Sequence, residues 1–446
     1  MSEHPLTLST RLIDSGVVGD AASAELKPNR ITQELSELAD GIALVESFSH
    51  VVAIDTGDGL VAFDSSGPRT GGAVLEALRG WSDKPVRSIV YTHGHVDHVG
   101  GSGAFAAEAA DRGRPAPEVL AQQAVDTRFD RYRATNGYNK VINSRQFGGA
   151  PKAAGQAVEK PFLPDDTLRP DTTYETRLEY RVGDVDFVLN ACKGETDDHT
   201  WTWVPQHRMI SAGDQFTWTF PNCGNPQKVQ RYPFEWAESL RAMAAMEPEL
   251  FVPAHGLPIT GAERIRSCLI TVATTLEQLV ADVVEAMNAG AVLDDIVHSV
   301  TVLEDSLALP FLRPVYDEPE FVVRNIWRLY GGWWDGNPAR LKPPSDEAVG
   351  VEVAALAGGV DPLIARAQAC STAGDHRMAC QLIEFAVAAE PESAEVHKAR
   401  AEIYGARRPA ETSLMAKGIF LSARADSELA LTGEVPEVKT VLPIDA

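Results

Sequence analysis

Before Glu263, apolar residues either alternate with polar ones or form short β-branched runs, a pattern typical of strands. We expect strands at 41–47, 50–56, 60–64, 86–91, 185–192, 208–212 and 250–253. The Gly-Asp-Gly sequence at 57–59 predicts a hairpin turn. Apolar residues at helical spacing predict helices over 71–81 and 235–246. Strands with interspersed helices indicate a layered α/β domain with a sheet core.

After Glu263 the periodicity becomes helical, with a long helix expected over 265–288 and another over 321–330. Helical segments continue to about residue 429. The spacing in 374–391 resembles one tetratricopeptide unit of two helices, too few for a solenoid. The expected parts of the chain are an N-terminal arm (1–28), an α/β catalytic domain (29–275), a helical dimerisation domain (276–430) and a tail (431–446).

Composition narrows the classes of partner. The chain has 446 residues and a net charge of −23, so it has no global positive field that attracts phosphates. We therefore expect no binding to nucleic acid or to a membrane surface, and no continuous apolar run reaches the length of a membrane span. Five scattered Cys argue against a disulfide framework, and Met1 to Ile13 lack the pattern of a secretory signal. These features predict a cytoplasmic protein.

The segment 90–101 concentrates candidate metal ligands directly after the strand expected at 86–91. Its sequence, VYTHGHVDHVGG, contains three imidazoles and a carboxylate, a spacing typical of a metal site rather than of a solvated loop. Nitrogen and oxygen donors suit zinc, with manganese or iron as alternatives. Four ligands this close cannot all serve one small ion that keeps open positions. We therefore predict two zinc ions.

Three more candidate ligands, Glu195, Asp214 and His255, follow predicted strands, where a rigid sheet holds side chains on adjacent loops. Three protein ligands per ion leave a position for water. The predicted ligands are His93, His95 and Glu195 for one ion and Asp97, His98 and His255 for the other, with Asp214 bridging. A water between the ions would lose its proton near neutral pH and act as the nucleophile.

Other residues near these strands have open assignments. Asp64 either orients a ligand His or caps a turn. His199, four residues after Glu195, is a ligand, an orienting group or an acid–base residue. The stretch 113–171 is rich in Pro, Gly and charge, and is either a substrate-side excursion or a solvated insertion. The residues predicted to act in catalysis are Asp97, Asp214, His199 and Arg145.

The motif at 92–98, THGHVDH, resembles the signature of the metallo-β-lactamase superfamily. This resemblance implies an αββα sandwich, here followed by an all-α, tetratricopeptide-like domain. Within the superfamily the chain looks most like type III alkylsulfatases, zinc enzymes that hydrolyse alkyl sulfate esters. Glu195 stands where most members have a third His, and His255 stands at the last ligand of the second ion. The helical region with GWWDGNP at 332–338 resembles the alkylsulfatase dimerisation domain.

The chain departs from the alkylsulfatase pattern in several places. Those enzymes have Glu at the bridging position, where this chain has Asp214. They also carry a His that serves as a general acid in the following segment, but residues 214–222 contain no His. We expect the C-terminal lipid-transfer-like domain of those enzymes to be missing. Arg145 lies near their anion-binding segment, so the resemblance implies that it could hold a sulfate.

The expected function is hydrolysis of a small anionic ester, with an alkyl or aryl sulfate favoured. Carboxylic esters, thioesters and lactones are alternative substrates because the same chemistry serves them. A phosphodiesterase suits the acidic surface less well. A non-catalytic helical adaptor is a further alternative, but it would have lost ligands, and all seven positions are filled. The apolar face of 265–288 and the tetratricopeptide-like segment predict a homodimer, unless these helices pack wholly within the chain.

Overall fold

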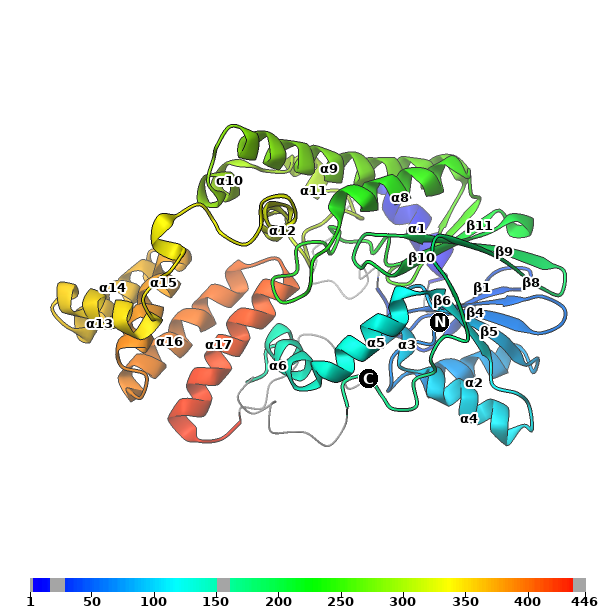
Figure 1. The fold of residues 1–446 in the computed structure, drawn as a ribbon, viewed down its shortest axis with the longest axis horizontal. Helices are drawn as coiled ribbons and strands as arrows, with labels where there is room; N and C mark the ends of the chain where they lie inside the picture. The colour runs from blue at the N-terminus through cyan, green and yellow to red at the C-terminus, as the bar shows by residue number, and fades with distance from the viewer. Residues whose placement is uncertain (1–2, 17–28, 151–160, 436–446) are drawn as a thin grey trace. The chain divides into compact units, whose positions relative to one another are not determined.

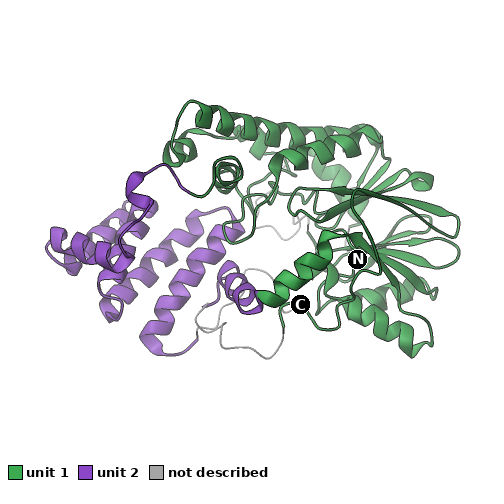
Figure 2. Ribbon diagram, viewed as in Figure 1, with its two compact units in different colours: residues 1–134, 161–333 green, residues 135–160, 334–446 purple. Residues whose placement is uncertain are grey.

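The computed structural model describes residues 3–16, 29–150 and 161–435, which form two compact units (Figures 1 and 2). Unit 1 comprises 1–134 and 161–333, and unit 2 comprises 135–160 and 334–446. Parts of the expected arm (17–28), of the central stretch (151–160) and of the tail (436–446) lie outside the described residues.

Unit 1 contains a first sheet of seven strands in the order β1 to β7. The first four strands pair antiparallel and the last four pair parallel. The strands are β1 (Leu35–Ala39), β2 (Ile42–Val45), β3 (Val51–Asp55), β4 (Leu60–Phe63), β5 (Val86–Val90), β6 (Glu118–Gln122) and β7 (Thr172–Tyr174). One face packs on α2 (Gly71–Trp81), α4 (Ser102–Asp111) and α5 (Ala124–Ala134), with Leu78, Phe105 and Phe129 in that core.

The second sheet has six strands in the order β13-β12-β11-β10-β9-β8. Its strands are β8 (Arg177–Val182), β9 (Val185–Cys192), β10 (His199–Val204), β11 (Met209–Gly213), β12 (Leu250–Pro253) and β13 (Ile259–Thr260). The outer face packs on α8 (Pro233–Ala245) and α9 (Ala262–Asn288), which run side by side in Figure 1. The described part of the expected arm forms α1 (Pro5–Ser15), whose Leu8 and Leu12 enter the same core.

The inner faces of the two sheets share a core of alternating apolar residues. Val185, Phe187 and Leu189 point inward from β9, and the Phe187 ring lies 6.1 Å from that of Phe63 on β4. Because period-2 alternation gives each sheet one face for the partner sheet and the other for helices, the layers are α, β, β and α. The predicted αββα sandwich is confirmed.

Unit 1 continues beyond the second sheet, through the long helix α9, to residue 333. By length and composition α9 could cross a membrane, as could α13 (Asp346–Ala357) and α14 (Val360–Thr372) taken together as one bent span. Its buried residues, including Ile265, Leu276 and Val283, pack in the core beneath the second sheet. Three more helices of unit 1 follow it: α10 (Leu293–Ser299), α11 (Glu304–Leu307) and α12 (Pro319–Gly331).

Unit 2 is entirely helical in its described part. It contains α6 (Asn136–Gln146), α13 (Asp346–Ala357), α14 (Val360–Thr372), α15 (His376–Ala389), α16 (Ala394–Arg407) and α17 (Leu414–Thr432). Side chains of Ser345, Asp375, Ser393 and Ser413 cap α13, α15, α16 and α17. The helix α6 approaches α17 so closely that a Cβ at Gly418 would lie 1.7 Å from the Gln146 carbonyl oxygen. The predicted all-α region after the sandwich is therefore present.

Candidate metal centre

The histidine-rich segment leaves the end of β5 and turns into the short helix α3 (Val96–Val99). His93 and His95 precede α3, whereas Asp97 and His98 lie within it. The turn between the first two histidines is tight, because a Cβ at Gly94 would lie 2.8 Å from Arg128 Cδ and 3.0 Å from Asp198 Oδ2. A side chain at this position would push the loop away from its support.

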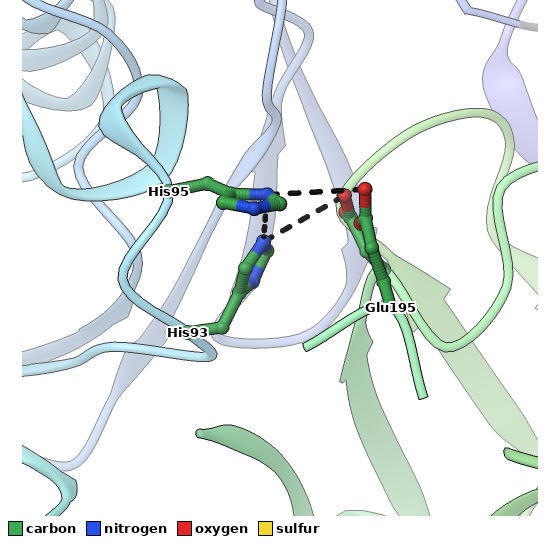
Figure 3. Close-up of side chains that lie close together, drawn as sticks. His93, His95 and Glu195 are labelled. Carbon is green, nitrogen blue, oxygen red and sulfur yellow. Dashed lines mark hydrogen bonds and ion pairs between the residues drawn. The ribbon is translucent and has the colours of Figure 1, made fainter. Parts of the chain in front are cut away.

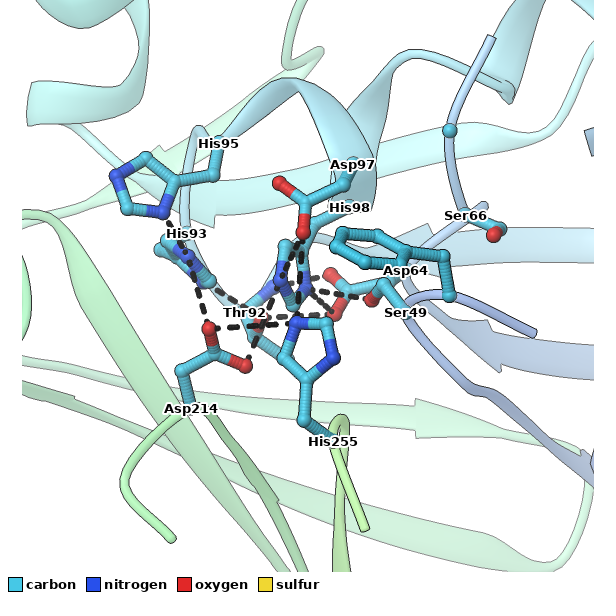
Figure 4. Close-up of polar contacts among 12 residues, drawn as sticks. Ser49, Asp64, Ser66, Thr92, His93, His95, Asp97, His98, Asp214 and His255 are labelled. Carbon is cyan, nitrogen blue, oxygen red and sulfur yellow. Dashed lines mark hydrogen bonds and ion pairs between the residues drawn. The ribbon is translucent and has the colours of Figure 1, made fainter. Parts of the chain in front are cut away.

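The structure brings all seven predicted ligands together (Figures 3 and 4). Glu195 follows β9, Asp214 follows β11 and His255 follows β12, so each lies at a strand end, as expected. The seven fall into two groups, each with ligand atoms within 4.8 Å of one another: His93, His95, Glu195 and Asp214 in the first, and Asp97, His98 and His255 in the second.

Asp214 lies between the two groups. Its Oδ2 is 3.9 Å from His93 Nε2 and 3.6 Å from His255 Nε2, and its Oδ1 is 3.5 Å from His98 Nε2. In the second group, Asp97 Oδ2 is 3.4 Å from His255 Nε2. Ligands about 2.0–2.1 Å from a tetrahedral zinc ion are themselves about 3.4 Å apart. The spacing therefore suits cations held between these side chains.

Several donor atoms of these groups lack a hydrogen-bond partner among the described residues. They are His98 Nε2, Glu195 Oε2 and Asp214 Oδ1, all buried. Unpaired polar atoms are costly to bury, and bound cations would compensate that cost. Burial lowers the pKa of His93 and His95 well below its ordinary value, which keeps both imidazoles in the neutral, ligating form. The residues present thus fit a pair of metal ions.

The two buried carboxylates differ in electrostatic environment. Burial raises the pKa of Glu195 to about 8, against the opposing effect of Arg231. Burial would also raise the pKa of Asp214, but His255 and His98 outweigh it and hold that pKa well below its ordinary value. Cations between the groups would stabilise the ionised form of both.

Asp64 orients His98, as the first of its two sequence interpretations proposed. Its Oδ2 lies 2.7 Å from His98 Nδ1, and both carboxylate oxygens also accept hydrogen bonds from Thr92, at 2.8 Å each. The Ser49 hydroxyl lies 2.9 Å from the same imidazole nitrogen. Asp64 has a φ of 63°, a left-handed conformation uncommon outside glycine. With Nδ1 so occupied, Nε2 of His98 is directed toward Asp214.

We expect Asp64→Asn to weaken metal binding by about 10–100-fold, the usual effect of removing a carboxylate behind a ligand His. The amide is less able to hold His98 in the tautomer that exposes Nε2. Zinc affinity measured by chelator competition, together with kcat/KM, would detect the loss. Asp58→Asn, at the exposed hairpin turn, is the matched control. Unchanged affinity in Asp64→Asn would contradict the orienting role.

His199 is the first residue of β10, and both of its ring nitrogens contact other parts of the protein. Its Nε2 accepts a hydrogen bond of 3.1 Å from the Asp214 backbone N–H, and its Nδ1 lies 3.8 Å from Cys192 Sγ. The ring stacks on His93 at 4.8 Å. Gly213 makes this possible, since a Cβ there would lie 2.7 Å from His199 Cε1. Burial lowers the pKa of His199 to about 4. These contacts favour the orienting interpretation over the acid–base one.

Two arginines beside the ligands form ion pairs that were not anticipated from the sequence. Arg128 on α5 pairs with both Asp197 and Asp198, and the Asp198 side chain also accepts a bond of 3.2 Å from Gly94 N. Arg231 pairs with Glu195 at 2.6 Å. The sequence shows that 113–171 is rich in charge, but no sequence pattern pairs Arg128 with Asp198.

Arg145, the predicted sulfate-binding residue, lies at the end of α6 in unit 2. The ligand groups lie in unit 1. The sulfate-binding role of Arg145 stays a prediction. Of the central stretch, 118–122 is a strand of the first sheet and 124–134 is a helix of unit 1, so this part is integral to the fold.

Comparisons with known proteins agree with this architecture. The metallo-beta-lactamase superfamily model matches residues 44–255, and the alkyl sulfatase dimerisation model matches residues 292–429. A linear primary-alkylsulfatase from Pseudomonas sp. is 25% identical over 403 residues, covering 88% of this chain and 75% of the relative. The alkyl/aryl-sulfatase BDS1 of Saccharomyces cerevisiae is 24% identical over 332 residues, covering 71% of this chain and 51% of that protein.

Among solved structures, the stereoselective inverting sec-alkylsulfatase Pisa1 from Pseudomonas sp. matches with a TM-score of 0.79 and 21% identity. The match covers 90% of this chain and 66% of that chain, so this chain spans about two thirds of the solved alkylsulfatase. Together the two family matches extend over the sandwich and the helical region. The chain carries a domain of the metallo-β-lactamase superfamily joined to an alkyl sulfatase dimerisation domain, and in this combination it is similar to the alkylsulfatases.

Proposed function

We propose that this protein is a dinuclear zinc hydrolase of alkyl or aryl sulfate esters. The superfamily fold and the alkylsulfatase relatives support a metal-dependent hydrolase acting on ester bonds. The observation that carries the finer proposal is the convergence of seven donor side chains, with Asp214 facing both groups. The chain aligns with alkylsulfatases over most of its length, and this similarity favours a sulfate ester as the substrate.

The proposed ligands are His93, His95 and Glu195 for one ion and Asp97, His98 and His255 for the other, with Asp214 shared. When bound, the ions would supply a nucleophilic hydroxide at neutral pH and polarise the ester. Asp64 holds the His98 ring and His199 holds the Asp214 backbone, so both ligands are oriented before substrate arrives.

Among the described residues, no His beside the ligand groups is free of a ligand or orienting role and able to donate a proton to the leaving group. Residues 214–222 contain no His, and the ring nitrogens of His199 face Asp214 N and Cys192 Sγ. Such a site suits a leaving group that departs without a proton, such as sulfate or an aryl oxide. Carboxylic esters, thioesters and lactones are the alternative substrates, since the same ligand set serves acyl transfer.

The proposed protein is a homodimer in the cytoplasm. The match to the alkyl sulfatase dimerisation family supports a homodimer formed through the helical region. We also propose a cytoplasmic location, on the basis of the scattered cysteines.

A substrate panel tests the function. Purified protein would be assayed with alkyl and aryl sulfates, a lactone, a thioester and a phosphodiester, each with and without chelator, while metal content is measured by elemental analysis. We expect two zinc ions per chain and chelator-sensitive turnover of sulfates. Turnover of acyl substrates alone would replace the sulfatase proposal with the alternative. Protein that binds no transition metal would contradict both.

A further inference from the structure

The carboxylate of Glu195 is held on one side only. Its Oε1 accepts hydrogen bonds from Asn222 Nδ2 and, at 2.6 Å, from Arg231 Nη1, whereas Oε2 has no partner among the described residues. The Glu195 and Arg231 side chains are each 3% exposed. Two donors on one oxygen fix the orientation of the carboxylate, whose Oε1 also lies 3.9 Å from His95 Nδ1. The arrangement thus holds the Glu195 carboxylate beside the first ligand group and leaves Oε2 without a protein partner among the described residues.

Arg231 is itself fixed by α12. The Asn325 side chain on that helix accepts a bond from Arg231 N at 3.4 Å and donates one to Arg231 O at 3.0 Å. It also accepts a bond of 2.9 Å from Gln230 Nε2. Arg231 Nη1 additionally donates to the carbonyl of Asn222, which joins the two groups that hold Glu195. One buried amide therefore fixes the backbone on both sides of Arg231.

The segment carrying Asn222 also packs on the start of α12. Asp317 accepts a bond of 2.5 Å from Gly224 N and another of 2.8 Å from Glu318 N. A Cβ at Gly224 would lie 2.3 Å from Val322 N, so the chain at this point is in direct backbone contact with the helix. Since α12 (Pro319–Gly331) falls within the segment that matches the dimerisation family, this segment reaches the metal centre.

We propose that α12 is a structural part of the metal centre: Asn325 fixes Arg231, and Arg231 with Asn222 positions Glu195 for the ion shared with His93 and His95. The inference rests on the proposed ligand role of Glu195. Arg231 also places a positive charge beside the carboxylates of Glu195 and Asp214, which lowers their mutual repulsion. Asp64 supports the other ion, so the two ions have separate positioning groups.

The test measures metal affinity rather than activity alone. We expect Arg231→Gln to weaken one of the two zinc dissociation constants by about 10–100-fold in chelator competition and to leave the other unchanged. Asn325→Ala is expected to weaken the same constant by a smaller factor. The visible spectrum of the cobalt-substituted protein should shift in both variants, and Arg231→Lys should restore part of the affinity. Arg324→Ala, the neighbouring α12 residue with an exposed pair to Glu320, is the control.

The outcomes separate the inference from the function on which it rests. Wild-type protein that binds no metal would contradict the proposed function. Wild-type protein with two ions, together with unchanged constants and cobalt spectra in Arg231→Gln and Asn325→Ala, would overturn the inference and leave the function intact. Equal weakening of both ions would also overturn it, because a general loss of structure has no preference between them. If Arg231→Gln does not fold, Asn325→Ala alone decides.

Discussion

Replacing Asp214 with Ala is expected to lower kcat/KM for a sulfate ester by about 10³-fold or more. Asp214 faces His93 on one side and His98 and His255 on the other, so its loss removes a donor from both proposed ion sets. Metal ions contribute several kcal/mol of transition-state stabilisation, and about 1.4 kcal/mol corresponds to a tenfold change in rate. Steady-state kinetics and metal stoichiometry would be measured on the same preparation.

The same substitution should also destabilise the metal-free protein. His98 and His255 hold the pKa of Asp214 well below its ordinary value, so ionised Asp214 stabilises the fold near neutral pH, and its loss leaves two buried imidazoles without this partner. We therefore expect the chelated variant to melt below the temperature of the chelated wild type, with unchanged circular dichroism where both are folded. Asp184→Ala, at a fully exposed position, controls for the loss of an acidic residue. Wild-type kcat/KM in Asp214→Ala would exclude a bridging role.

Replacing Arg128 with Ala is expected to cost about 3–5 kcal/mol in the free energy of unfolding, the usual effect of leaving a buried charge without its partner. The Arg128 and Asp198 side chains are 2% and 0% exposed, and Asp198 also supports Gly94 between two ligand histidines. Urea denaturation at neutral pH measures the loss. The control is Arg169→Ala, which removes ion pairs to Asp126 and Asp130 on α5. Because the Arg169 side chain is 40% exposed, its loss should lower the free energy of unfolding by only about 0–1 kcal/mol.

The pH dependence of this pair has a definite sign. Burial would raise the pKa of Asp198, but Arg128 outweighs it and the pKa lies below its ordinary value. A lowered pKa in the folded state contributes stability above the unfolded-state pKa of about 3.9, and that contribution is lost as the pH falls through the folded-state value. Without Arg128, burial alone would favour the protonated form of Asp198. The stability that Arg128→Ala loses relative to the wild type should therefore be largest near neutral pH, where Asp198 would have to be ionised. A loss independent of pH would contradict this account.

The sandwich and the clustering of the seven candidate ligands could be predicted because each depends on local sequence. Alternating apolar residues marked β9 and a short apolar run marked β12, both at their observed bounds, and the candidate ligands follow strand ends. Six of the thirteen strands in the described residues were not predicted, namely β1, β6, β7, β8, β10 and β13. Two of them show why. In β8 the charged Arg177, Glu179 and Arg181 occupy the exposed face of an edge strand, and β10 begins with His199, a residue considered only for its chemical role.

The groups that support the ligands could not be predicted because the fold alone brings them together. Arg231 lies 36 residues from Glu195 and 94 from Asn325, and Arg128 lies 70 from Asp198. Periodicity likewise shows that α9 has an apolar face but not which surface covers it, so the sequence gives no basis for placing α9 to α12 with the sandwich.

Each of the two units is formed from two separate segments of the chain, which limits where the protein can be truncated or recombined. The backbone passes from unit 1 to unit 2 at residue 135, returns at 161 and leaves again at 334. A truncation after residue 333 would therefore remove α17 and expose the face of α6 at Gln146 that α17 covers. Chimeras that exchange the helical unit with a homologue should transplant 135–160 and 334–446 as a matched pair.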